Sequence, residues 1–225
     1  MGQQSPRTTY KRAQSCRVKQ VMRANIYIAR HGQNEDNANG LLNGHRDLPL
    51  TELGRDQARQ LGEGALQLGL GFAAIYSSPL GRAYETAQIV SDTMGLHETP
   101  TVLDEIIERD FGIMTGRPYS DIEPMCAPDI IKTDTVTYFL NPDGAETFPQ
   151  LVRRGELALN RVKRAEHQDD VLLVCHGDIG KMIFAAATGR PWQDVLHNFH
   201  FGNGDLIKVG TDDSVHVLAL PQYNM

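Results

Sequence analysis

Two histidine–glycine pairs are the first candidates for chemistry in this sequence. His31-Gly32 and His176-Gly177 each follow a short apolar run with the composition of a buried β-strand. Open α/β sheets bind ligands at the carboxyl ends of their strands, and such ends lie side by side. We therefore expect the two imidazoles to meet across one crevice. Gly32 would let the backbone turn sharply and approach a ligand closely.

Two arginines add positive charge to the predicted crevice. Arg30 directly precedes His31, and Arg82 lies in the first turn of the helix expected after the second strand. The free amides at a helix start favour an anion, and guanidinium groups are fork-shaped donors that suit phosphate oxygens. Because these cations would repel a metal ion, we expect neither a metal nor a cofactor here. The set predicts a pocket for a dianionic phosphoryl group.

The elements that must position these groups alternate between strands and helices. Apolar patterning predicts strands at 25–30, 73–77, 101–103, 171–175, 205–209 and 215–219, and helices at 51–68, 79–94, 146–165 and 178–188. This alternation predicts an α/β fold of three α/β/α layers around a mainly parallel, doubly wound sheet. Residues 113–145 are irregular and hold four prolines, so we expect a small inserted lid over the site.

Four residues mark where the predicted helices begin or end. Thr51 is a plausible N-cap of helix 51–68. Ser78-Pro79 reads as N-cap and first residue of helix 79–94. Gly95 fits the C-terminal stop of the same helix.

Charge divides the chain into a tail and a body. Residues 1–23 hold six of the 22 basic side chains and no acidic one, so 16 basic and 28 acidic side chains give the remainder a net charge of −12. We interpret 1–22 as a disordered basic tail and 23–225 as a single domain. A mitochondrial presequence, or a chain start at Met22, stays open as an alternative for the tail.

Composition excludes several classes of partner. The acidic body argues against nucleic acid, which requires clustered Lys and Arg, but a small phosphorylated substrate meets only the local field of its pocket. No apolar run approaches the roughly 18 residues of a membrane span. The three widely spaced cysteines favour a reducing compartment, so we expect a cytoplasmic protein. The oligomeric state is unreadable, and a homodimer is one arrangement that the sequence allows.

Five short motifs, in family order over about 150 residues, resemble those of the histidine phosphatase superfamily, the phosphoglycerate-mutase-like enzymes. The matching segments are Arg30-His31-Gly32 with Asn37, Pro49-Leu50-Thr51 with Gly54, Ser77-Ser78 with Leu80, Arg82 and Thr86, Glu108-Arg109 with Phe111 and Gly112, and His176-Gly177. Each motif is modest evidence by itself, whereas the ordered set is highly specific.

The resemblance implies a role for each matched polar residue. His31 would attack phosphorus and carry a phosphohistidine intermediate. The oxygens of the phosphoryl group would be held by Arg30, Asn37, Arg82 and His176. Catalysis would then depend mostly on positioning and charge stabilisation.

The same resemblance identifies the proton donor and the substrate contacts. Glu108 would protonate the leaving oxygen and then take a proton from water, so it needs a raised pKa. Glu105 lies three residues earlier and could compete, but the spacing of Glu108 to Gly112 fits the family turn. Further substrate contacts are expected from Asn43, Gly44, Gly177 and Asp178.

Three functions remain to be distinguished. Hydrolysis of a phosphomonoester is favoured over mutase-type phosphoryl transfer, because a second phosphate lacks an obvious clamp. Lys132 is the only cation within 118–145, and the Arg153-Arg154 pair reads as a solvated helix face. An inactive scaffold that only binds phosphorylated ligands is the third alternative.

Overall fold

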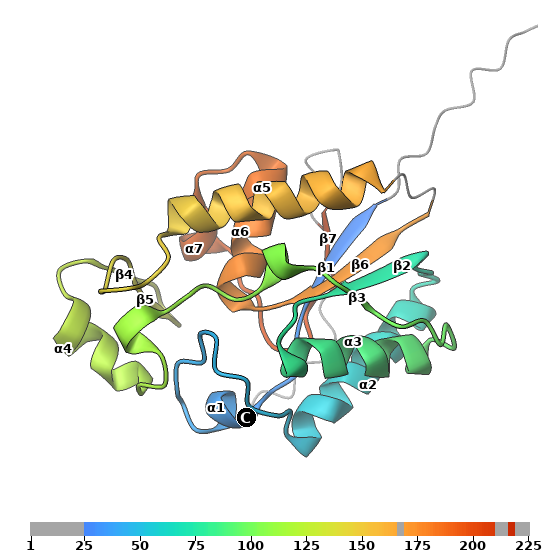
Figure 1. Cartoon of the computed structure of the whole chain (residues 1–225), viewed down its shortest axis with the longest axis horizontal. Helices are drawn as coiled ribbons and strands as arrows, with labels where there is room; N and C mark the ends of the chain where they lie inside the picture. The colour runs from blue at the N-terminus through green and yellow to red at the C-terminus, as the bar shows by residue number, and fades with distance from the viewer. Residues whose placement is uncertain (1–24, 166–168, 210–215, 219–225) are drawn as a thin grey trace, which may run out of the picture.

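A computed structural model describes residues 25–165 and 169–209 and the backbone of 216–218. The predicted tail at 1–22 lies outside this part of the chain. The main sheet has the strand order β3-β2-β6-β1-β7-β8 (Figure 1). Its strands are β1 Ile26–Arg30, β2 Ala74–Ser77, β3 Thr101–Val102, β6 Val171–Cys175, β7 Leu206–Val209 and β8 His216–Leu218.

The sheet is mainly parallel, as the alternation of elements predicts. β1 and β2 both pair in parallel with the central strand β6, and β3 continues in parallel on the outside of β2. β7 and β8 close the other edge in antiparallel pairing. Strands β1 and β6 are covered on both faces, which explains why their sequences are continuously apolar rather than alternating.

Helices cover both faces of the sheet and complete the expected three layers (Figure 1). One face packs against α5 Phe148–Arg164, α6 Gly177–Thr188 and α7 Trp192–Asn198, and the other against α2 Glu52–Gln67 and α3 Gly81–Thr93. Successive side chains of a strand pack against opposite helix layers: Ile28 and Leu173 face the first layer, and Tyr27 and Leu172 face the second. Helix α7 was not among the predicted helices. In the part of the chain that the structure describes, no helix is long and apolar enough to cross a membrane.

The segment 113–145 contains short regular elements where the sequence predicts irregular structure. After the 3₁₀ turns η1 Asp104–Ile106, η2 Gly112–Met114 and η3 Tyr119–Asp121 come α4 Ile122–Cys126 and a hairpin of β4 Ile130–Lys132 and β5 Thr137–Phe139. A separate apolar cluster holds the segment together, formed by Leu42, Phe111, Met114, Ile122, Cys126 and Phe139. The segment therefore has its own small core beside the main one.

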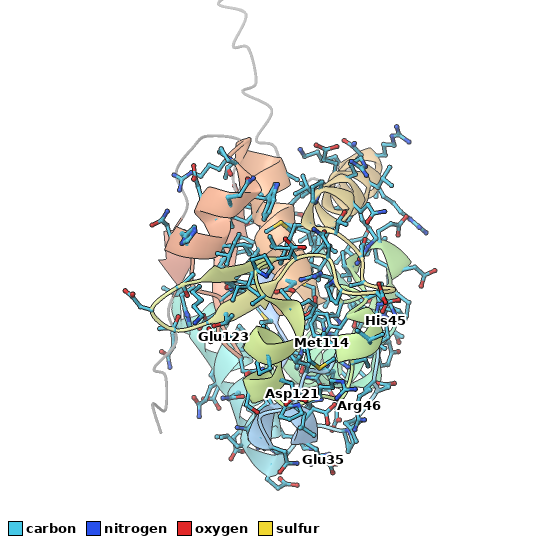
Figure 2. The ribbon with its side chains drawn as sticks, turned by 90° about the vertical axis from the view of Figure 1, so that its left-hand side faces the viewer. Glu35, His45, Arg46, Met114, Asp121 and Glu123 are labelled. Carbon is cyan, nitrogen blue, oxygen red and sulfur yellow. The ribbon has the colours of Figure 1, made fainter. Side chains whose placement is uncertain are left out.

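Backbone hydrogen bonds join this segment to the loop after β1. Leu42 N donates to Arg117 O at 2.8 Å, and Gly116 N donates to Leu42 O at 2.7 Å. Figure 2 looks onto this end of the molecule, where Met114 of the segment appears on the same face as His45 and Arg46 of the loop. The two pieces of chain form one wall of the candidate site.

Several element ends differ from those predicted. Helix α3 begins at Gly81 rather than Pro79, because Leu80 has an extended backbone and donates its N–H to Ser78 Oγ at 3.3 Å. A short helix, α1 Glu35–Ala38, lies in the predicted loop after β1, capped by Asn34. Two predictions are confirmed: Thr51 caps α2 by accepting from Gly54 N, and Gly95 follows the end of α3 with φ +69°.

The turn after His31 crosses the start of α2 at very close range. A Cβ on Gly32 would overlap the carbonyl oxygen of Gly54, and a Cβ on Gly54 would overlap the carbonyl oxygen of Gln33. Glycine is required at both positions because two backbones touch there. This crossing fixes the path of the chain as it leaves β1 and therefore the place of the His31 ring.

Candidate active site

The pairing of β1 with β6 brings the two histidines together. Arg30 lies opposite Cys175 in the parallel register, so the next residues of the two strands, His31 and His176, emerge side by side. Their ring centroids are 5.0 Å apart with an interplanar angle of 61°. Both rings are buried. The carboxyl end of the sheet thus holds the imidazole pair that the sequence led us to expect.

His31 is held as a neutral imidazole with a defined tautomer. Its Nδ1 lies 2.6 Å from Gly32 O, which only accepts hydrogen bonds, so Nδ1 carries the proton. Nε2 accepts a hydrogen bond from Arg82 Nε at 3.2 Å. Burial, followed by the charges of Arg82 and Arg30, holds the pKa of His31 well below its usual range. Nε2 is therefore the unprotonated nitrogen of this ring.

Arg82 is fixed in place by backbone carbonyls. Its side chain is buried; Nη2 donates to Gly44 O at 3.0 Å and Nη1 to Arg46 O at 2.5 Å. Burial lowers the pKa of Arg82 to about 10, so the guanidinium stays charged at neutral pH. Gly44 thus acts here through its carbonyl, and Arg46, which the sequence analysis did not identify, contributes in the same way.

Two buried side-chain nitrogens at the strand ends have no hydrogen-bond partner. Among the described residues, the buried side-chain nitrogen or oxygen atoms without a partner are Arg30 Nε and His176 Nδ1. The remaining groups of the two side chains are anchored: Arg30 Nη1 donates to Phe201 O at 2.9 Å, and His176 Nε2 lies 2.7 Å from Ser78 Oγ. Arg30 Nε carries a hydrogen, and an unmet buried donor costs about 1–3 kcal/mol. Because Arg30 lines the cavity, this donor indicates a site built for an oxyanion.

Two asparagines, Asn37 and Asn43, line the same cavity. Asn37 Oδ1 accepts from Asn203 Nδ2 at 3.2 Å, and Asn43 Oδ1 accepts from Asn34 Nδ2 at 2.6 Å. Because each carbonyl oxygen is engaged, the NH₂ group is the part that can bind a ligand. Asn203 and Asn34 were missed by the sequence analysis, although the Gly202-Asn203-Gly204 turn before β7 is a recognisable signal.

Glu108 reaches the start of α6. Its Oε1 accepts from Arg109 N at 2.8 Å and Ile179 N at 3.1 Å, and its Oε2 accepts from Asp178 N at 3.3 Å. Burial and then the charge of Asp178 raise the pKa of Glu108 above its usual value. Glu105 instead forms an ion pair with Arg161 at 3.0 Å. Of the two carboxyl groups, Glu108 is the one that lines the cavity.

Arg154 corrects one expectation from the sequence. Rather than forming a solvated face with Arg153, its guanidinium donates to Glu105 O at 3.0 Å, Ile107 O at 2.5 Å and Glu108 O at 3.1 Å. These carbonyls belong to an irregular turn and need donors from elsewhere. The arginine therefore supports the turn that carries Glu108, while Arg153 is exposed.

These groups face one cavity of about 410 Å³. One end is lined by the strand ends and nearby loops, through Arg30, His31, Asn37, Asn43, Arg82, Glu108 and Gly177. The other end is lined by α6 and the 113–145 segment, through Tyr119, Ile122, Thr135, Val136, Tyr138, Phe139, Asp178 and Lys181. His176 and Gly44 support the first end from behind and do not line the cavity themselves.

Comparison with known proteins agrees with this geometry. A profile of the histidine phosphatase superfamily, branch 1, matches residues 26–222. A 2,3-bisphosphoglycerate-dependent phosphoglycerate mutase of a Methylobacterium strain is 33% identical over 176 residues, 76% of this chain and 83% of the mutase.

Solved structures share the fold. The YhfR protein of Bacillus stearothermophilus has 26% identity and a TM-score of 0.71, with 87% of this chain and 95% of that chain covered. A mycobacterial glucosyl-3-phosphoglycerate phosphatase has 24% identity and a TM-score of 0.70, with 82% and 92% covered. The profile match spans most of the domain and includes every matched motif, so this chain belongs to the histidine phosphatase superfamily, branch 1.

Proposed function

We propose that this protein hydrolyses the phosphomonoester bond of a small phosphorylated metabolite through a phosphohistidine intermediate. In the first step, Nε2 of His31 attacks phosphorus, an N–P bond forms and the P–O ester bond breaks. Glu108 gives its proton to the leaving oxygen. Arg30 and Arg82 hold the phosphoryl oxygens together with the asparagine NH₂ groups, and stabilise their charge.

In the second step, water attacks the phosphorus of phosphohistidine. Glu108, now a carboxylate, takes the proton from the water, the N–P bond breaks, and inorganic phosphate leaves. The neutral His31 and the protonated Glu108 are regenerated. One carboxyl group thus serves as acid and then as base, and one difficult displacement becomes two easier ones.

The observation that carries this proposal is the opposite direction of two pKa shifts in one cavity. The same burial lowers the pKa of His31 and raises the pKa of Glu108. Both directions favour the state that the first step needs, which is an unprotonated nucleophile beside a protonated acid.

Mutase-type phosphoryl transfer is the second candidate, because curated relatives at about 33% identity are named phosphoglycerate mutases. Hydrolysis remains favoured because, among the described residues that line the second end of the cavity, Lys181 is a single cation and offers no paired clamp for another dianionic phosphate, while Arg109 is bonded to Asp178 and to backbone carbonyls. Lys132 is paired with Glu123 at 2.7 Å, and Arg154 is engaged by the Glu108 turn. Neither side chain lines the cavity.

A direct test compares the wild type with His31→Ala on p-nitrophenyl phosphate, with EDTA present. The wild type should release phosphate, and the variant should lose this activity and the acid-labile phosphoenzyme. His197→Ala is the matched control, because His197 is exposed on α7. Turnover by His31→Ala at the wild-type rate would overturn the mechanism.

The alternatives give different results in the same assays. A mutase interconverts 2- and 3-phosphoglycerate and depends on a 2,3-bisphosphoglycerate primer. A scaffold binds phosphorylated ligands and shows neither activity. Phosphate release that requires no primer supports hydrolysis.

A further inference from the structure

A lysine that the proposed mechanism does not use is buried in the wall of the cavity. Lys181 lies on α6, is 6% exposed, and lines the second end of the cavity. Its Nζ donates to Tyr138 Oη at 2.5 Å and lies 4.9 Å from the centroid of that ring. Among the described residues, no carboxylate lies within ion-pair distance of this ammonium group.

The geometry of α6 directs Lys181 toward the phosphate end. Gly177 and Lys181 are four residues apart and so share one face of the helix. Gly177 is next to Arg30, since a Cβ placed on this glycine would lie 3.6 Å from Arg30 Cζ. One helical turn, about 6 Å, separates the two positions along the helix axis. A small molecule held at the first end can therefore reach Lys181 with its other end.

In the part of the chain that the structure describes, the carboxylates near Lys181 have other partners. Asp178, the nearest carboxylate along α6, is paired with the buried Arg109 at 3.3 Å. Glu108 accepts hydrogen bonds from three backbone N–H groups, those of Arg109, Asp178 and Ile179. Burial lowers the pKa of Lys181 to about 8, so most molecules carry the charge at pH 7. A buried ammonium without a counter-ion is costly, whereas an apolar side chain of similar size would pack freely.

We propose that Lys181, oriented by Tyr138, binds a carboxylate of the substrate. Resting on the proposed function, this inference defines the substrate as a small phosphomonoester whose carboxylate lies a few bonds from the ester oxygen. An ammonium group has three donors and Tyr138 occupies one, so the others are available to a ligand. The single positive charge of the ammonium group is suited to a carboxylate, which has one negative charge. The dianionic phosphoryl group instead binds to the two guanidinium groups at the first end.

A pair of substrates that differ in one group tests this assignment. 3-Phosphoglycerate carries a carboxylate where glycerol 3-phosphate carries a hydroxymethyl group. The measured quantity is the ratio of kcat/KM for the first substrate to kcat/KM for the second. Lys181→Met should lower this ratio by about ten- to a hundredfold, the range expected for a lost charge-assisted hydrogen bond. A ratio that stays within twofold of the wild type would overturn the proposal.

A second variant and a matched control complete the design. Tyr138→Phe keeps the ring and removes the hydroxyl that orients the ammonium, so it should lower the ratio by a smaller factor. If Lys181→Met does not fold, the kcat/KM ratio of Tyr138→Phe tests the proposal instead, and an unchanged ratio would overturn it. Lys132→Met is the control, because Lys132 is half-exposed on β4 and does not line the cavity. Its ratio should match the wild type.

A binding assay separates this inference from the proposed function. If the wild type does not hydrolyse p-nitrophenyl phosphate, the proposed function fails. The carboxylate site is then tested by thermal unfolding with each ligand. 3-Phosphoglycerate should raise the Tm of the wild type more than glycerol 3-phosphate does, and Lys181→Met should remove the difference. Equal shifts for the two ligands in the wild type would refute the carboxylate site.

Discussion

Replacement of Glu108 by glutamine should separate activity from stability. The carboxyl group is held by three backbone N–H groups, two of them on Oε1 at 2.8 and 3.1 Å and one on Oε2 at 3.3 Å. A glutamine placed with its oxygen at the Oε1 position keeps the first two bonds and loses the third. One lost neutral hydrogen bond costs about 0.5–1.5 kcal/mol. The protein should therefore stay folded.

The same change removes the proton that the leaving group needs. General acid catalysis contributes roughly 10²- to 10⁴-fold, or about 3–5 kcal/mol. The loss should be largest for an alkyl phosphate, whose alkoxide is a poor leaving group. It should be smaller for p-nitrophenyl phosphate, because nitrophenolate leaves without much help. The expected loss of activity thus exceeds the expected loss of stability several times over.

The assay measures kcat for an alkyl phosphate and for p-nitrophenyl phosphate, alongside urea unfolding of each variant. Glu105→Gln is the matched control, because its carboxyl pairs with Arg161 at the surface; such pairs contribute at most about 1 kcal/mol. Its kcat values should stay within about threefold of the wild type. Equal kcat losses for the two substrates in Glu108→Gln, or no loss, would refute the role of Glu108 as acid.

Three further changes test the electrostatics and the backbone. Asp178→Asn removes a charge that raises the pKa of Glu108. Glu108 should then lose its proton at lower pH, and the alkaline limb of the pH–kcat profile should move to lower pH. An unmoved limb would contradict the role of Glu108 as the acid. Folding lowers the pKa of His31 below the usual value of about 6.5, so below that pH the unfolded chain binds more protons than the folded one. The free energy of unfolding should therefore be unaffected by His31 above about pH 6.5 and fall by up to about 1.4 kcal/mol per pH unit below it. His31→Gln, measured by urea unfolding from pH 7 to 5, should show a shallower slope, and parallel slopes would count against this linkage. Gly54→Ala forces a Cβ into the carbonyl of Gln33 and should lower the free energy of unfolding by about 1–3 kcal/mol, while Gly71→Ala, which meets nothing within 4 Å, should cost less than about 0.5 kcal/mol.

The sequence was sufficient to predict the layers and the central strands. Continuous apolar runs such as Val171–Cys175 are buried on both faces, and the pattern that reveals them is local. The ends of elements were less predictable. Pro79 fits the first turn of a helix by its own preference, but the backbone of Leu80 is extended and moves the helix start to Gly81. Tertiary contacts decided this boundary.

The same division holds for the site. The types and order of Arg30, His31, Arg82 and His176 were enough to predict an oxyanion pocket, because each belongs to a motif with its own chemical logic. The supporting residues were not predictable. Arg154 and Lys181 lie in helices whose sequences give no sign of the turn or the cavity that they face.

The sequence by itself therefore determined which groups carry charge, accept protons or turn the backbone, since these properties belong to single residues and their neighbours. Only the tertiary structure decided which carbonyls hold Arg82, which carboxyl group is buried beside α6, and which buried lysine lines the cavity. Burial, the local dielectric and contacts shorter than 4 Å depend on segments that are far apart in the chain. A local sequence pattern therefore cannot predict them.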